Sequence, residues 1–342
     1  MRYDDLFIAA AALHTEHISP VSAELREGRC DERTAERSGI TSVAVSTGSA
    51  APELAVGAAR TALRRSGVHP DEVDLLLHAT VQYQGHDLWA PASYVQRHAL
   101  GNRCPAVEIR QLSNGGMAAL ELAAGVVAGG SGGAALLTTG DVFGAPGFDR
   151  WNSDPGTVYG DAGTALVLAR GRGFARLRAL ATVSDPDLEG MHRGADPFGR
   201  MPFSQRTPID LGLLQRAFVD EHGRSYSVAR ITAGQDDALK RALTEADCTL
   251  DDVAWFVLPH FGRGRLRSTF LRRWGIEEER TTWPWGRTVG HLGAGDQFAG
   301  LAALAASGRT RPGERCLVFG VGAGFTWSCA VLELGETPAG SG

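Results

Sequence analysis

The sequence is poor in cysteine and has no long hydrophobic run. Its 342 residues include five cysteines, without a CxxC pair or histidine neighbours at metal-ligand spacing. A metal site is therefore not expected, and the odd number of scattered thiols favours a cytoplasmic protein over a disulfide framework. The apolar run in the first residues, MRYDDLFIAAAALHT, is far shorter than the ~20 residues of a membrane helix, and its acidic pair does not fit a signal peptide. We expect a soluble protein, not a membrane protein, whose first strand lies here.

Positive charge is also in the minority. The formal net charge of −5 does not indicate a general attraction to nucleic acid or to an anionic membrane, although a local basic patch stays open. Lysine is nearly absent, because Lys240 is the one lysine among 34 basic residues, but this skew says nothing about chemistry. The 43% hydrophobic content supports a large core, and at ~100–200 residues per domain the length fits two units or one large α/β body.

A pattern of helix, break, acidic turn and buried strand occurs twice. It covers ARTALRRSGVHPDEVDLLLHAT at 59–80 and LKRALTEADCTLDDVAWFVLPH at 239–260, an offset of 180 residues (239 against 59). Each copy is followed by a helix, a Gly-rich turn with a small-residue helix, and a buried strand. These elements are expected at 91–100, 117–127 and 134–139 in the first half and at 266–274, 298–306 and 316–319 in the second. Matching halves predict a duplicated α/β fold with two central helices back to back.

The repeat suggests a division of the chain into an N-terminal half (1–182), an insertion (183–228), a C-terminal half (229–334) and a tail (335–342). The insertion contains Pro, Gly, Arg and aromatic residues without a sustained period. Such a segment is either a pocket wall or lid, or a plain surface excursion. The tail is expected to be disordered.

Ser113 is the best candidate for a nucleophile. It follows a short β-type run and precedes Asn114, Gly115 and Gly116, which form a tight turn without a bulky side chain. A side chain at the start of the buried helix 117–127 faces unpaired N–H groups and the positive end of the helix dipole, where a negatively charged oxygen is favoured. Because serine is also a preferred N-cap residue, a simple capping role stays open from the local sequence.

His291 and Asp296 could activate this serine. Serine is a weak nucleophile at neutral pH and needs a base, with a third group to orient the base. In TVGHLGAGDQFAG the two residues flank a Gly-rich turn at the start of the second central helix, the position that the duplication relates to the Ser113 turn. If the central helices meet at their N-termini, the three residues form a Ser-His-Asp triad.

Two further groups could serve the same site. His260 ends a buried strand in VLPH, where active-site residues of α/β folds gather, although a structural role is the alternative. Near the C-terminus, the Gly-rich turn GVGAGFTWS could complete an oxyanion hole, with the backbone N–H of Ala323 beside that of Ser113.

Arginines cluster directly after His260. The stretch FGRGRLRSTFLRRW contains Arg263, Arg265, Arg267, Arg272 and Arg273. At the mouth of the expected site, such a cluster in an acidic protein suits a phosphate-bearing or acidic partner. A solvated face without a partner is the alternative.

These motifs together resemble the thiolase superfamily, most closely its ketoacyl-acyl-carrier-protein synthase III branch, over nearly the whole chain. VLPHFGRGRLR is similar to the family's strand end with Pro-His, YGDAGTALVL (159–168) to its GDGA strand, GHLGAG to its GN-containing turn, and GAGFTWS to its GGGFTWG turn. The resemblance implies the thiolase-like duplicated α-β-α-β-α sandwich. In that family a Cys is the nucleophile, and a His and an Asn assist decarboxylation and carbon–carbon bond formation. Here Ser113 stands at the Cys position, His260 at the His position and His291 at the Asn position.

The departures at the Cys and Asn positions favour acyl transfer over condensation. Condensation needs paired neutral donors around a developing enolate, and a His oriented by Asp296 removes one donor and supplies a base. The pattern is similar to synthase-III-like acyltransferases of polyketide and antibiotic pathways, which move an acyl group to a hydroxyl, an amine or a carrier. It is also similar to a Ser-containing starter-unit enzyme that condenses, so a decarboxylating condensing enzyme is the alternative. A catalytically silent partner of a polyketide synthase is the third interpretation.

The resemblance also bears on the acyl donor. In the family, coenzyme A is held by a Trp and an Arg near the N-terminus and by an Arg before the GD strand; the corresponding residues here are Arg33, Arg37 and Pro155. Loss of the Trp and of one Arg favours an acyl carrier protein as donor, with no cofactor. The expected donor-binding residues are Arg37, Arg263, Arg265, Arg267 and Arg272. The resemblance further implies a homodimer.

Overall fold

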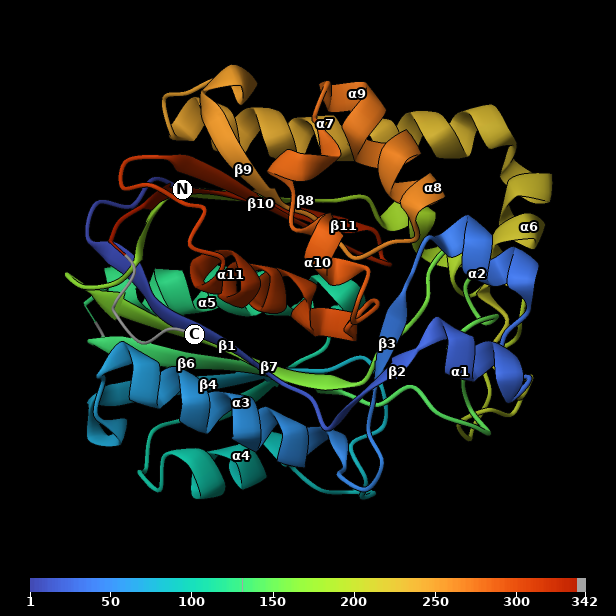
Figure 1. Ribbon diagram of the computed structural model, residues 1–342, viewed down its shortest axis with the longest axis horizontal. Coiled ribbons are helices and arrows are strands. Elements are labelled where there is room, and N and C mark those ends of the chain that lie inside the picture. Colours follow the sequence, from blue (N-terminus) through green and yellow to red (C-terminus); the bar gives the residue numbers. More distant parts are fainter. Residues whose placement is uncertain (131, 337–342) are drawn as a thin grey trace.

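Five layers of helix, sheet, helix, sheet and helix stack on one another in the computed structural model, which describes residues 1–130 and 132–336 (Figure 1). Two central helices, α5 (Gly115–Ala128) and α11 (Asp296–Ala306), lie side by side between the sheet layers. The predicted α-β-α-β-α sandwich with two paired central helices is confirmed.

Within the described residues, hydrogen bonds join the strands of both layers in the order β5-β4-β6-β7-β1-β8-β11-β10-β9. The strands are β1 (Leu6–His14), β4 (Val73–Ala79), β5 (Ala106–Ile109), β6 (Ala134–Asp141), β7 (Ala162–Arg170), β8 (Ala175–Ser184), β9 (Val253–Val257), β10 (Arg315–Gly322) and β11 (Thr326–Leu334). The two layers meet where β1 pairs antiparallel with β8, at Phe7 with Arg176 and at Ile8 with Ala175. In both layers the outer strands are parallel, β4 to β5 and β6 in one and β9 to β10 in the other.

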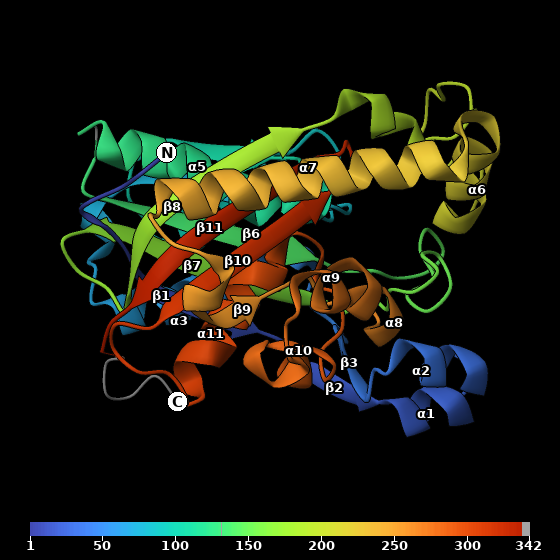
Figure 2. The ribbon, with the colours of Figure 1, turned by 90° about the horizontal axis from the view of Figure 1, so that it is seen from above.

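Helices cover the outer face of each layer. On one side lie α3 (Ala51–Ser66) and α4 (Pro91–Ala99), and on the other α7 (Arg224–Glu245) runs across β8 and β11 (Figure 2). The remaining named elements are β2 (His17–Pro20), α1 (Val21–Arg26), α2 (Glu32–Ser38), β3 (Ser42–Val45), α6 (Leu211–His222), α8 (Arg263–Leu266), α9 (Arg272–Trp274) and α10 (Trp283–Gly286). A π-helical turn joins α8 to α9, so the helix expected at 266–274 runs from 263 to 274. None of the helices described is long and apolar enough to cross a membrane.

The two halves repeat the same local plan. A short 3-10 turn precedes β4 at Pro70–Glu72 and precedes β9 at Leu250–Asp252, 180 residues later. Likewise, a 3-10 turn opens α5 at Leu112–Asn114 and α11 at Gly293–Gly295, 181 residues later (293 against 112). Ser113 and Ala294 therefore occupy equivalent positions.

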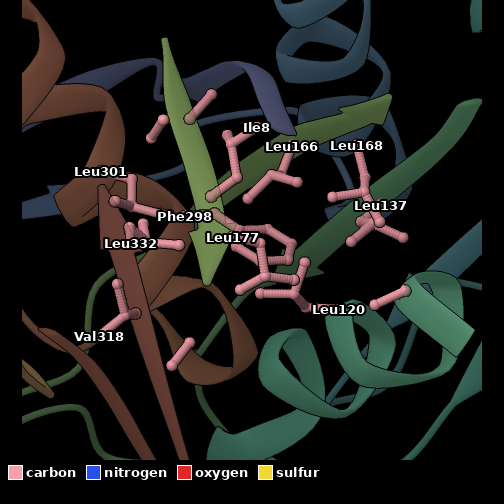
Figure 3. Packing of buried hydrophobic residues seen from close by; sticks show 14 of the residues in the cluster. Ile8, Leu120, Leu137, Leu166, Leu168, Leu177, Phe298, Leu301, Val318 and Leu332 are labelled. Carbon is pink, nitrogen blue, oxygen red and sulfur yellow. The ribbon is translucent and has the colours of Figure 1, made fainter. Parts of the chain in front are cut away.

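Apolar side chains from both halves fill the space around the central helices. Leu120 of α5 and Phe298 of α11 are buried and pack with strand residues such as Leu166, Leu177 and Leu332 (Figure 3). Small residues let the two helix starts approach each other. A Cβ on Gly116 would lie 2.5 Å from the carbonyl oxygen of Ala294, far inside van der Waals contact. The packing thus brings the N-termini of both central helices to one place.

The segment 183–228 is more regular than its sequence suggests. It contains the end of β8, a 3-10 turn at Pro186–Met191, the helix α6 and the start of α7. Within this segment, Leu214 and Phe218 form a short buried stripe on α6, and Asp210 caps the helix by accepting from Leu213 N. That the segment is an insertion stays a prediction. The residues from 192 to 210 form no regular element. The expected disordered tail lies outside the described residues from 337 onward.

Candidate active site

The Ser113 hydroxyl contacts a base, not the helix that follows it. Its Oγ lies 2.8 Å from His291 Nε2. The N-cap of α5 is Asn114, whose amide donates to Gln111 Oε1 and Ser328 Oγ at 2.8 and 2.9 Å. The capping alternative for Ser113 is therefore wrong.

Asp296 holds His291 from the opposite side. His291 Nδ1 lies 2.5 Å from Asp296 Oδ2, and the backbone N–H of Leu292 donates to Asp296 Oδ1 at 2.7 Å. Burial alone would raise the pKa of Asp296, but His260 and His291 beside it outweigh burial and lower that pKa. An ionised Asp296 accepts a hydrogen bond from the protonated Nδ1 of His291. This leaves Nε2 unprotonated and able to take the Ser113 proton. The geometry is that of a Ser-His-Asp triad.

His260 shares the same carboxylate. Its backbone N–H donates to Asp296 Oδ2 at 2.7 Å, and its ring Nδ1 lies 3.1 Å from the Gly290 carbonyl oxygen and 3.3 Å from Asp296 Oδ1. Both neighbours of Nδ1 are acceptors, so Nδ1 carries the proton. Nε2 is then a bare acceptor, and it has no hydrogen-bond partner among the described residues. Burial lowers the pKa of His260, so the ring is neutral at neutral pH.

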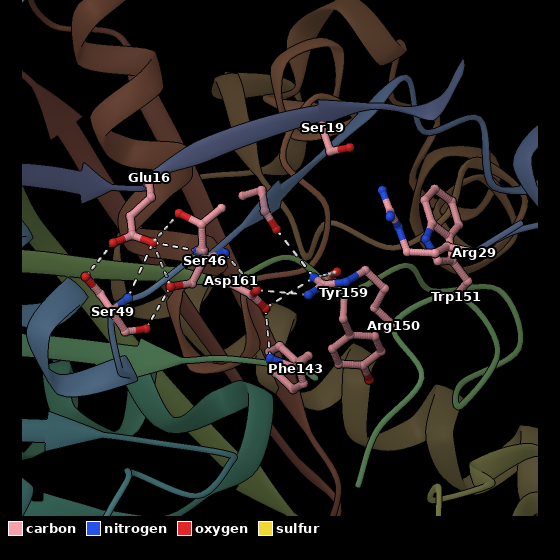
Figure 4. A network of polar contacts seen from close by, with 12 residues as sticks. Glu16, Ser19, Arg29, Ser46, Ser49, Phe143, Arg150, Trp151, Tyr159 and Asp161 are labelled. Carbon is pink, nitrogen blue, oxygen red and sulfur yellow. Dashed lines mark hydrogen bonds and ion pairs between the residues drawn. The ribbon is translucent and has the colours of Figure 1, made fainter. Parts of the chain in front are cut away.

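An aromatic group packs behind the base. The rings of Tyr159 and His291 meet edge to face with centroids 4.8 Å apart, and Phe143 and Phe148 pack on Tyr159. The buried Asp161 fixes this group, because it pairs with Arg150 at 2.9 Å and accepts from the backbone N–H of Phe143 at 2.8 Å (Figure 4).

A cavity of about 770 Å³ opens in front of Ser113. Its wall is mostly apolar and aromatic, with contributions from Tyr159, Phe143, Ile209 and Leu214. Residues 199 and 201–206 of the segment after β8 form part of the same wall. The cavity is large enough to hold a small organic molecule beside Ser113.

The expected oxyanion donors lie at this cavity. Ser113 and Ala323 both line it, and Ala323 belongs to the turn that joins β10 to β11. The turn approaches the serine closely, since a Cβ on Gly322 would lie 2.4 Å from the Gln111 carbonyl oxygen and 2.9 Å from Asn114 N. Only glycine fits at this point.

The arginines after His260 are not one free cationic surface. Arg263 pairs with Glu278 at 3.1 Å, Arg273 with Asp236 at 2.6 Å, and Arg265 with the buried Asp154 at 2.9 Å. The exposed Arg267 and Arg272 have no ion-pair partner among the described residues. Arg265 is thus held by a carboxylate of its own chain, and its expected role in donor binding stays a prediction.

A second, smaller cavity lies beside this pair. Its volume is about 440 Å³, and Arg37, Trp151, Pro155 and Arg265 are among the residues that line it. The exposed Arg37 and the Pro155 predicted to take the family's donor-binding positions thus share one cavity. Arg33, also exposed, lies on α2 with Arg37. In the described part of the chain, no group of three His, Cys, Asp or Glu side chains could hold a metal ion.

Sequence reasoning does not single out Asp141. This residue is fully buried at the end of β6 and accepts from the backbone N–H groups of Val81 and Gln82 at 2.7 and 2.8 Å and of Ala294 at 3.3 Å. Burial raises its pKa to about 7. It ties the wall of the cavity to the turn of the second half. An acidic residue that ends a fully buried strand is the signal that could have found it.

Comparisons with known proteins bear on the family and the fold of the chain. The family model described as 3-oxoacyl-[acyl-carrier-protein (ACP)] synthase III C terminal matches residues 243–334. A beta-ketoacyl-[acyl-carrier-protein] synthase III of Rhizorhabdus wittichii is 28% identical over 330 residues, which are 94% of this chain and 97% of that protein. The structure of ChlB3, named as an acyltransferase, has a TM-score of 0.92 and 35% identity over 98% of this chain and 99% of ChlB3. A 3-oxoacyl-(acyl carrier protein) synthase III from Xanthomonas oryzae shares the fold, with a TM-score of 0.76 and 18% identity over 97% of this chain and 100% of that one.

Proposed function

The chain belongs to the thiolase-like ketoacyl-acyl-carrier-protein synthase III family, and from this we propose that it is an acyltransferase that works through a seryl ester. An acyl-transferring enzyme is what the family relation itself supports. The finer proposal rests on one observation, the chain of contacts from Ser113 Oγ through His291 to Asp296.

The first half-reaction loads the acyl group. Ser113 Oγ attacks the thioester carbonyl while its proton passes to His291 Nε2, and the N–H groups of Ser113 and Ala323 stabilise the negative oxygen. When the carbon–sulfur bond breaks, His291 returns the proton to the leaving thiolate. Asp296 stabilises the imidazolium that forms between these two steps.

The second half-reaction uses the same base. A hydroxyl, amine or thiol of the acceptor loses its proton to His291 as it attacks the seryl ester, and the proton then returns to Ser113 Oγ as the carbon–oxygen bond breaks. One His-Asp pair therefore serves the whole ping-pong cycle.

The state of His260 favours transfer over decarboxylative condensation. Condensation needs hydrogen-bond donors at the thioester carbonyl that becomes an enolate. Here Nδ1 of His260 faces two acceptors, so Nε2 offers a lone pair, and the second histidine is committed to Ser113 and Asp296. A bare Nε2 suits an acceptor that still carries a proton, such as an amine or a hydroxyl.

We further propose an acyl carrier protein as the donor and a homodimer as the functional unit. The carrier proposal is supported by the names of the synthase III relatives and by Arg267 and Arg272, which are exposed, have no ion-pair partner among the described residues and follow the cavity-lining Arg265 in sequence. A place in polyketide or antibiotic biosynthesis rests on the resemblance of the motifs.

Intact-protein mass spectrometry tests the seryl ester. The full chain is incubated with a panel of acylated carrier proteins, and the expected result is one adduct, mapped to Ser113 by peptide sequencing. The added mass identifies the acyl group. Absence of any adduct across carriers and small thioesters would contradict the proposal.

Incubation of the acylated enzyme with malonyl carrier protein tests the reaction type. We expect no release of carbon dioxide and no ketoacyl product, because neither His260 nor His291 offers a hydrogen-bond donor to an enolate. Stoichiometric carbon dioxide with a two-carbon-extended product would replace acyl transfer by starter-unit condensation.

A further inference from the structure

Arg265 differs from the other arginines of its segment. Its guanidinium binds both oxygens of Asp154, at 2.9 and 3.0 Å, and also donates to Thr157 Oγ1 at 2.6 Å. The Phe261 ring packs against it at 5.4 Å. Such a two-pronged, stacked contact uses the planar fork of arginine, which lysine cannot reproduce. A side chain held in this way is not available for a visiting partner.

Asp154 connects Arg265 to Tyr159. It is 4% exposed, and the Tyr159 hydroxyl donates to its Oδ2 at 3.2 Å. Burial would raise the pKa of Asp154, but Arg265 outweighs burial and lowers it, so the carboxylate is ionised. Burial and the same carboxylate raise the pKa of Tyr159, so its hydroxyl keeps the proton that it donates.

Tyr159 in turn touches the base. Its ring lies edge to face on His291, with centroids 4.8 Å apart, and the Tyr159 carbonyl is held by Arg150 at 3.0 Å. His291 N also donates to the Val158 carbonyl, at 2.8 Å, so residues 158 and 159 contact the histidine through backbone and ring. An unbroken series of contacts thus runs from Arg265 to the imidazole.

The series separates the two cavities. Arg265 and Thr157 line the smaller one, and Tyr159 lines the larger one in front of Ser113. We propose that Arg265 is a positioning residue, which with Asp154 holds Tyr159 against His291 and so fixes the imidazole that activates Ser113. The inference rests on the proposed function, since it assigns a role toward the same base. It makes Arg265 a support of the reaction and leaves carrier contact to its exposed neighbours.

The test measures the reactivity of Ser113 without any acyl donor. A fluorophosphonate probe bonds to the serine oxygen and releases fluoride, while His291 takes the hydroxyl proton. The full chain is compared with R265Q, R265K and Y159F, and with R273Q as the matched control, because Arg273 lies in the same segment and also pairs with a carboxylate, that of Asp236. We expect R265Q to slow labelling by about tenfold to a hundredfold, because a displacement of the base by about 1 Å has an effect of that size. R265K should recover part of the rate, and R273Q should label like the natural chain.

Y159F keeps the test decisive if R265Q does not fold, since it removes one hydroxyl and leaves the ion pair in place. It should slow labelling by a few-fold, and in R265Q/Y159F the two losses should fall well short of multiplying, because both break one series of contacts. Thermal unfolding of each variant identifies a simple loss of fold. Labelling of folded Y159F and R265Q at the natural rate would overturn the inference.

The same variants separate this inference from the proposed function. If Ser113 reacts with the probe and R265Q slows that reaction, but no thioester acylates the natural chain, the positioning role stands and the acyltransferase proposal fails. If acylation proceeds and R265Q raises the KM of a carrier donor alone, while a small thioester reacts at the natural rate, Arg265 is a docking residue and the positioning role fails.

Discussion

The two turns that open the central helices share a backbone plan but carry different chemistry. Leu112 and Gly293 occupy equivalent positions and both have a positive φ, 46° and 60°. The next residue in the first half is Ser113, whereas Ala294 follows in the second. The common backbone brings the two turns together, and the side chains that differ between them make the site.

The base and its orienter also lack counterparts in the first half. By the offset of 181, His291 corresponds to Arg110 and Asp296 to Gly115. In the proposed mechanism the first half therefore supplies the nucleophile alone, and the second supplies the two groups that activate it. Under this proposal the duplicated fold yields one active site and not two.

Each half also shapes the turn of the other. Asp141 ends β6 and binds the second turn through Ala294 N, whereas Gly322, which corresponds to it, ends β10 and leaves room for the first turn. The end of β6 holds the second turn by a hydrogen bond, whereas the end of β10 makes room for the first turn because glycine has no side chain. Each half therefore contacts the turn of the other, but by a different kind of contact.

Ser113→Ala is the strongest test of this division of roles. It should abolish the acyl adduct, because the equivalent Ala294 has no hydroxyl to replace the lost nucleophile. Mass spectrometry after incubation with an acylated carrier protein measures the adduct. A variant that still acquires it and turns over normally would mean that another residue is the nucleophile.

His291→Ala and Asp296→Ala test the second half. Each should slow acylation by about 10⁴-fold or more, the size seen when a triad member is lost. The double variant should be little slower than the slower single one, because the pair acts as a unit. Single-turnover acylation rates provide the comparison, and fully multiplicative losses would indicate independent roles.

Asp141→Asn tests the contact between Asp141 and the second turn through the pH dependence of stability. The folded-state pKa of Asp141 is raised by burial to about 7, above the ordinary aspartate pKa of 3.8, so ionisation of the unfolded chain lowers stability progressively as the pH rises between these two values. At 1.36 kcal/mol per unit, this loss is at most about 4 kcal/mol. Asn does not titrate, so the stability of the natural chain relative to Asp141→Asn should fall from about pH 4 to pH 7. Urea unfolding across that range measures it, and parallel pH profiles would contradict the assignment.

Gly293→Ala and Leu112→Gly sharpen the comparison of the turns. A Cβ on Gly293 would lie 2.3 Å from Asp141 Oδ2 at a φ that favours glycine, so Gly293→Ala should destabilise the fold by about 2–3 kcal/mol. Leu112→Gly removes backbone strain along with a side chain at the cavity wall, so its effect on stability should stay below about 1 kcal/mol. Equal effects on the free energy of unfolding would show that the two turns are under the same constraint.

Much of the fold could be predicted from the hydrophobic periodicity and from the residues that mark the ends of helices and strands. The buried run at 73–79 is β4, and the helices expected at 117–127 and 298–306 start two residues earlier than predicted, at Gly115 and Asp296. Glycine and a buried aspartate carry no apolar signal, so the hydrophobic pattern begins after the helix does. The contacts of Ser113, His291 and Asp296 could be anticipated because the repeat relates their two turns.

Contacts between distant polar residues could not be read in the same way. Arg265 and Asp154 are 111 residues apart, and in sequence Arg265 looks like its neighbours Arg263 and Arg267. Asp141 binds backbone N–H groups, which leave no mark on residue type. Which residue such a side chain pairs with is determined only when the chain is folded.

A serine instead of a cysteine at residue 113 determines how the proposed nucleophile reacts with oxidants. A catalytic thiolate is converted to sulfenic and higher acids, whereas a serine hydroxyl is inert to peroxide. Among the described residues that line the larger cavity there is no cysteine, and Cys316 and Cys329 are buried in strands where burial raises the pKa of both thiols. Under the proposed mechanism the enzyme therefore keeps its nucleophile under oxidative conditions that would inactivate a catalytic thiol.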